Sequence, residues 1–86
     1  MDSVEALDEA LAVARTLGFE IREDWFDGRG GGPCRIRGRK CLFLDLQLSP
    51  RDRLAQVLET LRAEPGIVNV AVSSALGCLL RAGRAA

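Results

Sequence analysis

Apolar residues recur at three- and four-residue steps through positions 4–17, and this spacing predicts an amphipathic helix. Asp2 and Glu5 stand three residues apart at its start and match a capping box. Gly18, followed by the apolar Phe19, matches a Schellman motif at its end. The first element is therefore expected to be a helix that buries one face.

Alternation of apolar and polar residues with a period of two predicts three strands after this helix. The first covers residues 19–26 and has one polar face. The other two cover Cys34–Arg37 and Cys41–Leu48, and a tight hairpin turn at residues 38–40 joins them. We expect the leucine face of the last strand to meet the helices and this strand to be the best-buried one of the sheet. Its leucines are Leu42, Leu44, Leu46 and Leu48.

A second helix is predicted after the third strand, because three features favour a helix start at the same place. Ser49 is a good cap, Pro50 suits the first helical position, and Asp52 supplies an acid to the first turn. Apolar residues then continue at helical spacing until the Pro65-Gly66 pair ends the helix.

The C-terminal part of the chain is less regular and leaves alternatives open. Residues 67–72 are rich in β-branched side chains and form either a short edge strand or an extended segment. Ser73 or the serine after it then caps a last helical piece through Leu80, which Gly77 weakens. Residues 83–86 are expected to fray.

The order helix, strand, strand, strand, helix predicts an α+β fold with both main helices on one face of a three-stranded antiparallel meander. A short tail of strand or helix follows. A chain of 86 residues has room for one small core, so residues 1–86 are expected to form a single domain. No apolar run approaches the roughly 20 residues that span a bilayer. Because the first residues are also acidic, we expect a cytoplasmic protein without a membrane segment.

The residue types present exclude several chemistries. The chain has no histidine, which removes the commonest general base and the commonest zinc ligand. Cys34, Cys41 and Cys78 have no CxxC spacing and are expected to be reduced thiols. No metal site, cofactor or catalytic residue is therefore predicted. An enzyme would have to use Asp45, Glu59 or the thiols of Cys34 and Cys41, and whether those two cysteines face each other across the hairpin is left open.

Charge is segregated along a chain whose formal charge sums to zero. Residues 1–27 carry eight acids against two bases, residues 28–44 carry five bases and no acid, and residues 45–86 carry five bases against four acids. The basic stretch is also rich in glycine. It does not match a dinucleotide fingerprint, because Pro33 replaces the third glycine, and it does not match a phosphate loop, because no Gly-Lys pair precedes Ser or Thr.

Two interpretations of this basic stretch remain. In the first, backbone amides and cationic side chains bind an anion or a nucleic acid, and Trp25 and Phe26 lie nearby to stack on bases or to contact a partner. The residues of this candidate site are Arg29, Gly30, Gly31, Gly32, Arg35, Arg37, Arg39 and Lys40. In the second, Arg35 and Arg37 pair with acidic residues of the predicted strand 19–26 and are neutralised within the sheet.

The run from Gly30 through Leu61, GGGPCRIRGRKCLFLDLQLSPRDRLAQVLETL, resembles the sheet and following helix of the ImmA/IrrE-type bacterial metallopeptidases. Residues 17–22 are similar to the preceding strand in that family. The family's zinc-binding helix carries the motif H-E-x-x-H. Only Glu59 matches it, because Leu58 and Arg62 stand at the histidine positions. The resemblance therefore implies a scaffold of that type, or of small bacterial domains with the same layout, without the zinc site or the hydrolytic activity.

Three functions are compatible with these features. The one we favour is a non-catalytic module that binds a protein partner or a second copy of itself, through Trp25, Phe26 and an edge strand at 67–72. The second is binding of nucleic acid or a phosphate ligand through the glycine-rich basic segment 28–40. The third is a carboxylate or thiol enzyme, for which the spacing assigns no nucleophile, base and orienting residue.

Overall fold

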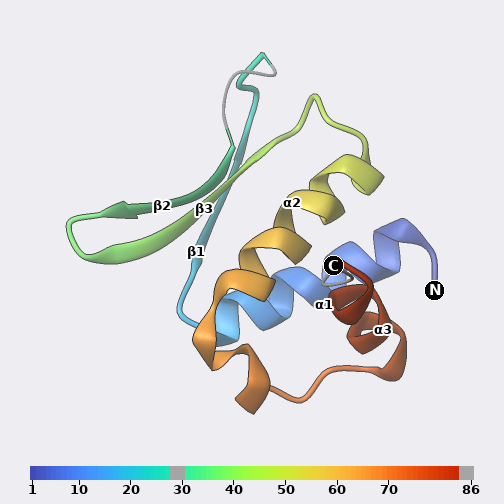
Figure 1. Cartoon of the computed structure of the whole chain (residues 1–86). Helices are drawn as coiled ribbons and strands as arrows, with labels where there is room; N and C mark the ends of the chain where they lie inside the picture. The colour runs from blue at the N-terminus through green and yellow to red at the C-terminus, as the bar shows by residue number, and fades with distance from the viewer. Residues whose placement is uncertain (28–30, 84–86) are drawn as a thin grey trace.

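The computed structural model describes residues 1–27 and 31–83 of the chain. Its main elements follow the predicted order α-β-β-β-α, and the predicted α+β class is confirmed. The α-helices lie on one side of a three-stranded sheet, and the turn between the second and third strands projects beyond them (Figure 1).

Helix α1 covers Ser3–Thr16 and has the predicted caps at both ends. The carboxylate of Asp2 accepts a hydrogen bond from the amide of Glu5 at 2.8 Å. At the other end Gly18 adopts a φ of 95°, and the amides of Gly18 and Phe19 donate to carbonyls of the last helical turn. This is the Schellman motif, in which glycine tolerates the left-handed backbone that turns the chain toward the sheet.

The sheet is mixed, so the prediction of an antiparallel meander is wrong. Its strands are β1 (Glu20–Asp24), β2 (Gly32–Ile36) and β3 (Arg39–Asp45), and their order across the sheet is β1-β3-β2. β3 runs parallel to β1 and antiparallel to β2. The physical reason lies in the composition of β3, which is the most apolar of the three. A central position removes more of such a strand from water than the edge position of a meander would.

The leucine face of β3 meets the helices, as predicted, but the strand is shorter than predicted. Leu42 and Leu44 are completely buried in the core. β3 ends at Asp45, so Leu46 and Leu48 lie in the turn that follows it and are only half-buried.

Helix α2 covers Pro50–Ala63 and begins at the predicted serine cap. The hydroxyl of Ser49 accepts a hydrogen bond from the amide of Asp52 at 3.1 Å. α1 and α2 pack against each other and against the sheet, and their apolar faces supply most of the core. The buried residues of α2 are Leu54, Val57, Leu58, Thr60 and Leu61.

The C-terminal segment is helical and extended, so the alternative of an edge strand at residues 67–72 is wrong. A 3₁₀ helix, η1, covers Pro65–Asn69, and helix α3 covers Ser74–Ala82. η1 contacts α2, and within the described residues it contacts no strand of the sheet. Residues 83–86 were predicted to fray. Gly83 caps α3, and residues 84–86 lie outside the described residues.

Ser73 joins α3 to α1. Its hydroxyl accepts a hydrogen bond from the amide of Leu76, so Ser73, one of the two serines predicted as the cap, caps α3. Its own amide and hydroxyl donate to the carboxylate of Glu9 on α1, at 2.7 and 2.6 Å. The hydroxyl bond and then the amide bond hold the pKa of Glu9 below its usual range, because both favour the charged form. Within the described ranges, no helix is long and apolar enough to cross a membrane.

Candidate functional site

The β2–β3 turn holds an arginine in a backbone conformation that arginine rarely adopts. Ile36 and Arg39 are paired across the strands, so Arg37 and Gly38 form a two-residue turn that begins one residue earlier than predicted. Their φ angles are 52° and 79°, as in a type I′ turn, where asparagine and glycine are preferred. The left-handed backbone costs an L-residue other than glycine about 1–2 kcal/mol.

The hairpin arginines are exposed, and no ion pair or side-chain hydrogen bond joins Arg35, Arg37 or Arg39 to the part of the chain that the structure describes. The other described cations mostly have such a partner. Besides these three, only Arg15 and Arg51 of the described residues lack one. Uncompensated positive charge is therefore concentrated on the hairpin.

Arg15, near the end of α1, extends this charged surface. Together with Arg35, Arg39 and Lys40 it lines a hollow of about 590 Å³ between the end of α1 and the hairpin. Among the described residues, Glu20 is the one carboxylate that lines this hollow. We call the surface formed by Arg15, Arg35, Arg37 and Arg39 the cationic hairpin surface. Arg15 could not be predicted as part of this surface, because helical periodicity places it on the polar face of α1 and nothing in the sequence relates that face to a distant turn.

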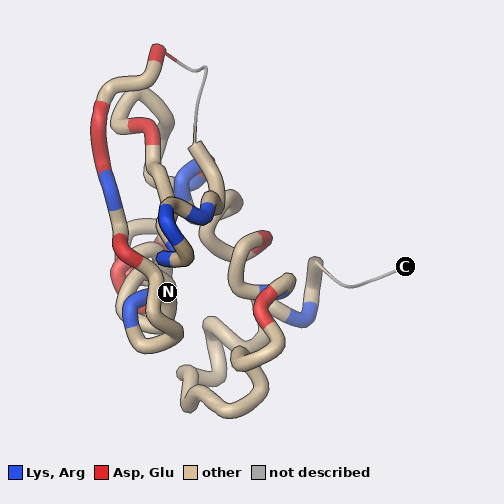
Figure 2. The backbone as a smooth tube through the Cα atoms, turned by 90° about the vertical axis from the view of Figure 1, so that its left-hand side faces the viewer, with Lys and Arg blue, Asp and Glu red and all other residues tan. Residues whose placement is uncertain are grey.

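Pairing of the hairpin arginines with the acids of β1, the second interpretation of the basic stretch, is wrong. β1 and β2 lie on opposite sides of β3 and are not neighbouring strands, and within the described ranges no ion pair joins Glu20, Glu23 or Asp24 to Arg35 or Arg37. Figure 2 shows acidic residues (red) along β1 and basic residues (blue) close together on the hairpin. Glu20 instead pairs with Arg22 of its own strand at 3.2 Å, and both are exposed.

Lys40 fixes the hairpin to the helical layer. Its ammonium group lies 2.8 Å from a carboxylate oxygen of Glu64 and 5.1 Å from the centre of the Phe19 ring. Both partners belong to the helix-facing side of the sheet, and the ion pair is partly buried. Lys40 was predicted as an anion ligand, but its charge is balanced by Glu64. It holds the hairpin in position beside α1.

The glycines predicted to form an anion nest are only partly described. Arg29 and Gly30 lie outside the described residues. Gly31 and Gly32 both have positive φ, 123° and 97°. A Cβ on Gly31 would stand 3.1 Å from Gln56 Oε1 and 3.3 Å from the Phe43 carbonyl, so this glycine permits a close approach of the chain to α2 and the sheet. Its role is accounted for by packing.

Trp25 and Phe26 lie far from the arginines. They follow Asp24, which pairs with Asp45 at the end of β3 opposite the turn, and Asp45 is six residue steps from Arg39 along the strand, or about 20 Å. Phe26 packs edge-on against Phe43, with ring centres 5.9 Å apart. Trp25 is 66% exposed. The predicted combination of cations with neighbouring aromatic rings is therefore divided between two ends of the sheet.

Cys34 and Cys41 stand directly opposite each other on β2 and β3, which settles the register that the sequence left open. Both are free thiols, Cys34 exposed and Cys41 only 3% exposed. The Cys41 thiol donates to the carboxylate of Glu20 at 3.9 Å. In the described part of the chain, no group of three or more cysteine, aspartate or glutamate side chains is placed to hold a metal ion.

The candidate residues for enzyme chemistry do not meet in one site. Asp45 is completely buried and accepts hydrogen bonds from the amides of Phe26 and Gln47, so it holds the backbone at the end of β3. Glu59 is exposed on α2, on the helical side. Cys41 lies four residues from Asp45 along β3, about 13 Å away.

No family model matches this chain, and comparisons with curated proteins and with solved structures likewise give no match. The resemblance to the ImmA/IrrE-type scaffold stays a prediction that rests on the residues quoted above.

Proposed function

We propose that this protein is a non-catalytic interaction module that binds an acidic segment of a partner protein through the cationic hairpin surface. Guanidinium groups pair with carboxylates in a bidentate geometry, and several of them on one projecting turn suit a run of acidic side chains. A cytoplasmic location, where the thiols stay reduced, belongs to the proposal. The ImmA/IrrE-type resemblance is compatible with it, because that resemblance retains a scaffold and lacks the zinc ligands.

The observation that carries the proposal is the absence of internal partners for the hairpin arginines. Arg35, Arg37 and Arg39 are exposed and form no ion pair with any residue in the described ranges, although the chain has as many acids as bases. The acids of β1 are held on the other side of β3. The sheet order therefore keeps positive charge available that a meander would have neutralised.

The conformation of Arg37 supports the same conclusion. Its φ of 52° is one that asparagine or glycine would adopt at lower free energy. Residues held in such conformations occur often at functional sites, where the side chain is needed despite the strain. An arginine at this position places a charge at the tip of the hairpin.

An acidic protein segment fits this surface better than a nucleic acid does. The chain has a formal charge of zero, whereas nucleic-acid-binding domains are usually strongly basic. A polyanion crossing the sheet from the hairpin would meet the exposed acids Glu20, Glu23 and Asp24 of β1. Trp25, the exposed aromatic residue, is about 20 Å from the turn and is not placed to stack on bases beside the arginines.

A second copy of this chain is the other protein partner to consider. The acids of β1 on one copy could meet the hairpin of another, and the reverse, in a twofold-symmetric dimer. Light scattering checks this point, since the proposal expects a monomer at low concentration. A stable closed dimer would favour the self-association that the sequence also allowed.

Fluorescence anisotropy with a labelled peptide rich in Glu and Asp tests the proposed function. Wild-type protein should bind the peptide saturably at low salt. The variant with alanine at Arg35, Arg37 and Arg39 should bind at least about tenfold more weakly, because it loses three charge-assisted contacts. Arg51→Ala is the control, since Arg51 is equally exposed and unpaired within the described ranges but lies on α2.

A single-stranded RNA of the same net charge is the competing probe in this assay. Tighter binding of the RNA than of the peptide would favour the nucleic-acid function instead. Equal binding of the peptide by the wild type and the triple variant would show that the hairpin is not the site.

A further inference from the structure

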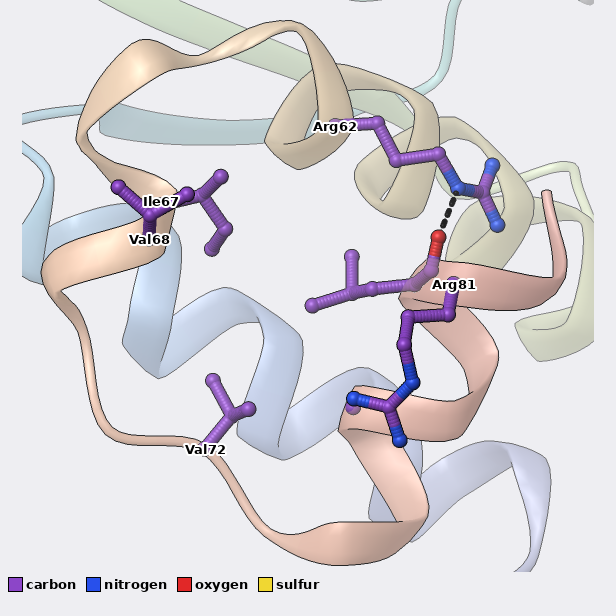
Figure 3. A pocket seen from close by; sticks show the side chains of 7 residues that line it. Arg62, Ile67, Val68, Val72 and Arg81 are labelled. Carbon is purple, nitrogen blue, oxygen red and sulfur yellow. Dashed lines mark hydrogen bonds between the residues drawn. The ribbon is translucent and has the colours of Figure 1, made fainter. Parts of the chain in front are cut away.

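A second site lies between α2, η1 and α3 and shares no lining residue with the hollow at the hairpin. It is an open cavity of about 160 Å³. Figure 3 shows Ile67, Val68 and Val72 on one side and the side chains of Arg62 and Arg81 across from them. An engineered apolar cavity of about 150 Å³ binds benzene, so this one has room for a single compact apolar group.

The helix that forms one wall of the cavity carries a glycine that its backbone does not need. Gly77 lies inside α3, where its φ is not positive and where alanine would stabilise the helix by about 1 kcal/mol. A Cβ on Gly77 would point between Arg81 Nη1, at 3.3 Å, and Val72 Cγ2, at 3.7 Å. The end of the arginine can move aside, so the fold would accept a side chain there. The absence of a side chain at Gly77 lets the Arg81 guanidinium lie against the helix at the wall of the cavity.

The rim of the cavity combines apolar surface with positive charge. Val68 is 78% exposed at this rim. Arg81 contacts the thiol of Cys78 at 3.6 Å and has no carboxylate partner among residues 1–27 and 31–83. Arg62 donates to the carbonyls of Leu79 and Leu80 and so keeps its charge fixed at the same rim. A ligand that fits must pair a compact apolar body with a negative charge.

The geometry points to a binding site for a small carboxylic acid with a branched or aromatic apolar group. The apolar group would occupy the hollow lined by Ile67, Val72 and Leu80, and the carboxylate would lie at the Arg81 guanidinium, which rests against Gly77. This site is independent of the proposed function of the hairpin.

Titration of ¹⁵N-labelled protein with isocaproate, followed by amide chemical shifts, tests this inference. Saturable shifts are expected at Gly77, at Leu80 and in the segment from Ile67 to Val72. Isocaproamide, which has the same apolar body without the charge, should bind roughly tenfold more weakly. No saturable shift at these amides up to about 50 mM, or shifts confined to the hairpin, would overturn the inference.

Two variants separate the apolar and charged parts of the site. Gly77→Leu fills the cavity and should abolish the shifts, and Arg81→Gln should weaken binding of isocaproate to the level of isocaproamide. Arg81 is exposed, so Arg81→Gln is expected to fold normally. This variant keeps the test decisive if Gly77→Leu shows no cooperative unfolding transition and is therefore not folded. Unchanged isocaproate affinity in Arg81→Gln, or in folded Gly77→Leu, would contradict the site.

Discussion

Individual residues in this chain often occupy positions where another amino acid would give a more stable fold, and Arg37 is the clearest case. Its φ of 52° lies in the left-handed region, and it precedes Gly38 in a turn that favours Asn-Gly. We expect Arg37→Asn to raise the free energy of unfolding by about 0.5–1 kcal/mol while weakening binding to an acidic peptide. Urea unfolding and the anisotropy assay measure the two effects.

The neighbouring glycine provides the control for this prediction. Gly38→Ala should lower the free energy of unfolding by about 1 kcal/mol or more, because alanine cannot adopt a φ of 79° without strain. If Arg37→Asn destabilised the protein, the arginine would be contributing native contacts, and our explanation of its retention would be wrong.

Two other glycines should respond to alanine in opposite directions. Gly31→Ala should destabilise the protein, since Gly31 has a φ of 123° and its Cβ would stand 3.1 Å from Gln56 Oε1. Gly77→Ala should stabilise it by up to about 1 kcal/mol, because Gly77 is helical and only the end of Arg81 must move. Thermal unfolding of both variants checks this, and a loss of stability in Gly77→Ala would show that packing requires that glycine.

At the level of helices and strands, the sequence predicted the ends of the helices correctly and the order of the strands incorrectly. The caps at Asp2, Ser49 and Ser73 and the stop at Gly18 were predictable, because each depends on a side chain within a few residues. The order β1-β3-β2 was not, since period-two patterns show which residues share a face and do not show which strands are neighbours. The apolar composition of β3 was nevertheless a sign of its central place.

The hairpin register brings two thiols together, and we expect mild oxidation to join them. Cys34 and Cys41 are cross-strand partners, so their Cα atoms are about 4.5–5.5 Å apart, within the range of disulfides. Closing this short loop should stabilise the folded protein by about 2 kcal/mol. Mass spectrometry after diamide treatment should find a Cys34–Cys41 bridge and leave Cys78 reduced. A bridge that includes Cys78 would contradict the register.

The contact between α1 and α3 should depend on pH through Glu9. Hydrogen bonds from Ser73 lower the pKa of Glu9 in the folded protein, so the charged carboxylate stabilises the fold. This stabilisation is fully present above the usual glutamate pKa of about 4.3 and is lost as the pH falls through the lowered folded-state value. Glu9→Gln should therefore be less stable than the wild type at neutral pH, with a difference that shrinks in acid.

Chemical denaturation across the acid range measures this difference. Glu59→Gln is the matched control, because Glu59 is exposed and has no side-chain hydrogen bond within the described ranges. A Glu9→Gln difference that stayed constant with pH would show that the Ser73 contact does not depend on the charge of Glu9.

At the scale of the whole molecule, the candidate site could be predicted only in part. The sequence identified Arg35, Arg37 and Arg39, because basic residues adjacent in the chain remain close in a hairpin. It could not show that β3 would separate them from the acids of β1, or that α1 would bring Arg15 beside them. These features depend on tertiary packing. They turn a charge pattern along the chain into a surface with uncompensated charge.

If the cationic hairpin surface selects an acidic protein partner, a quantitative pull-down from a lysate of the source cells should show that selectivity. The wild type is compared with Arg39→Glu, on the hairpin, and with Arg51→Glu, which makes the same charge change at an exposed position on α2. We predict that the wild type and Arg51→Glu capture proteins with acidic segments and that these proteins stay bound after nuclease treatment. Arg39→Glu should not capture them. Capture that is equal in all three, or that nuclease removes, would contradict the claim.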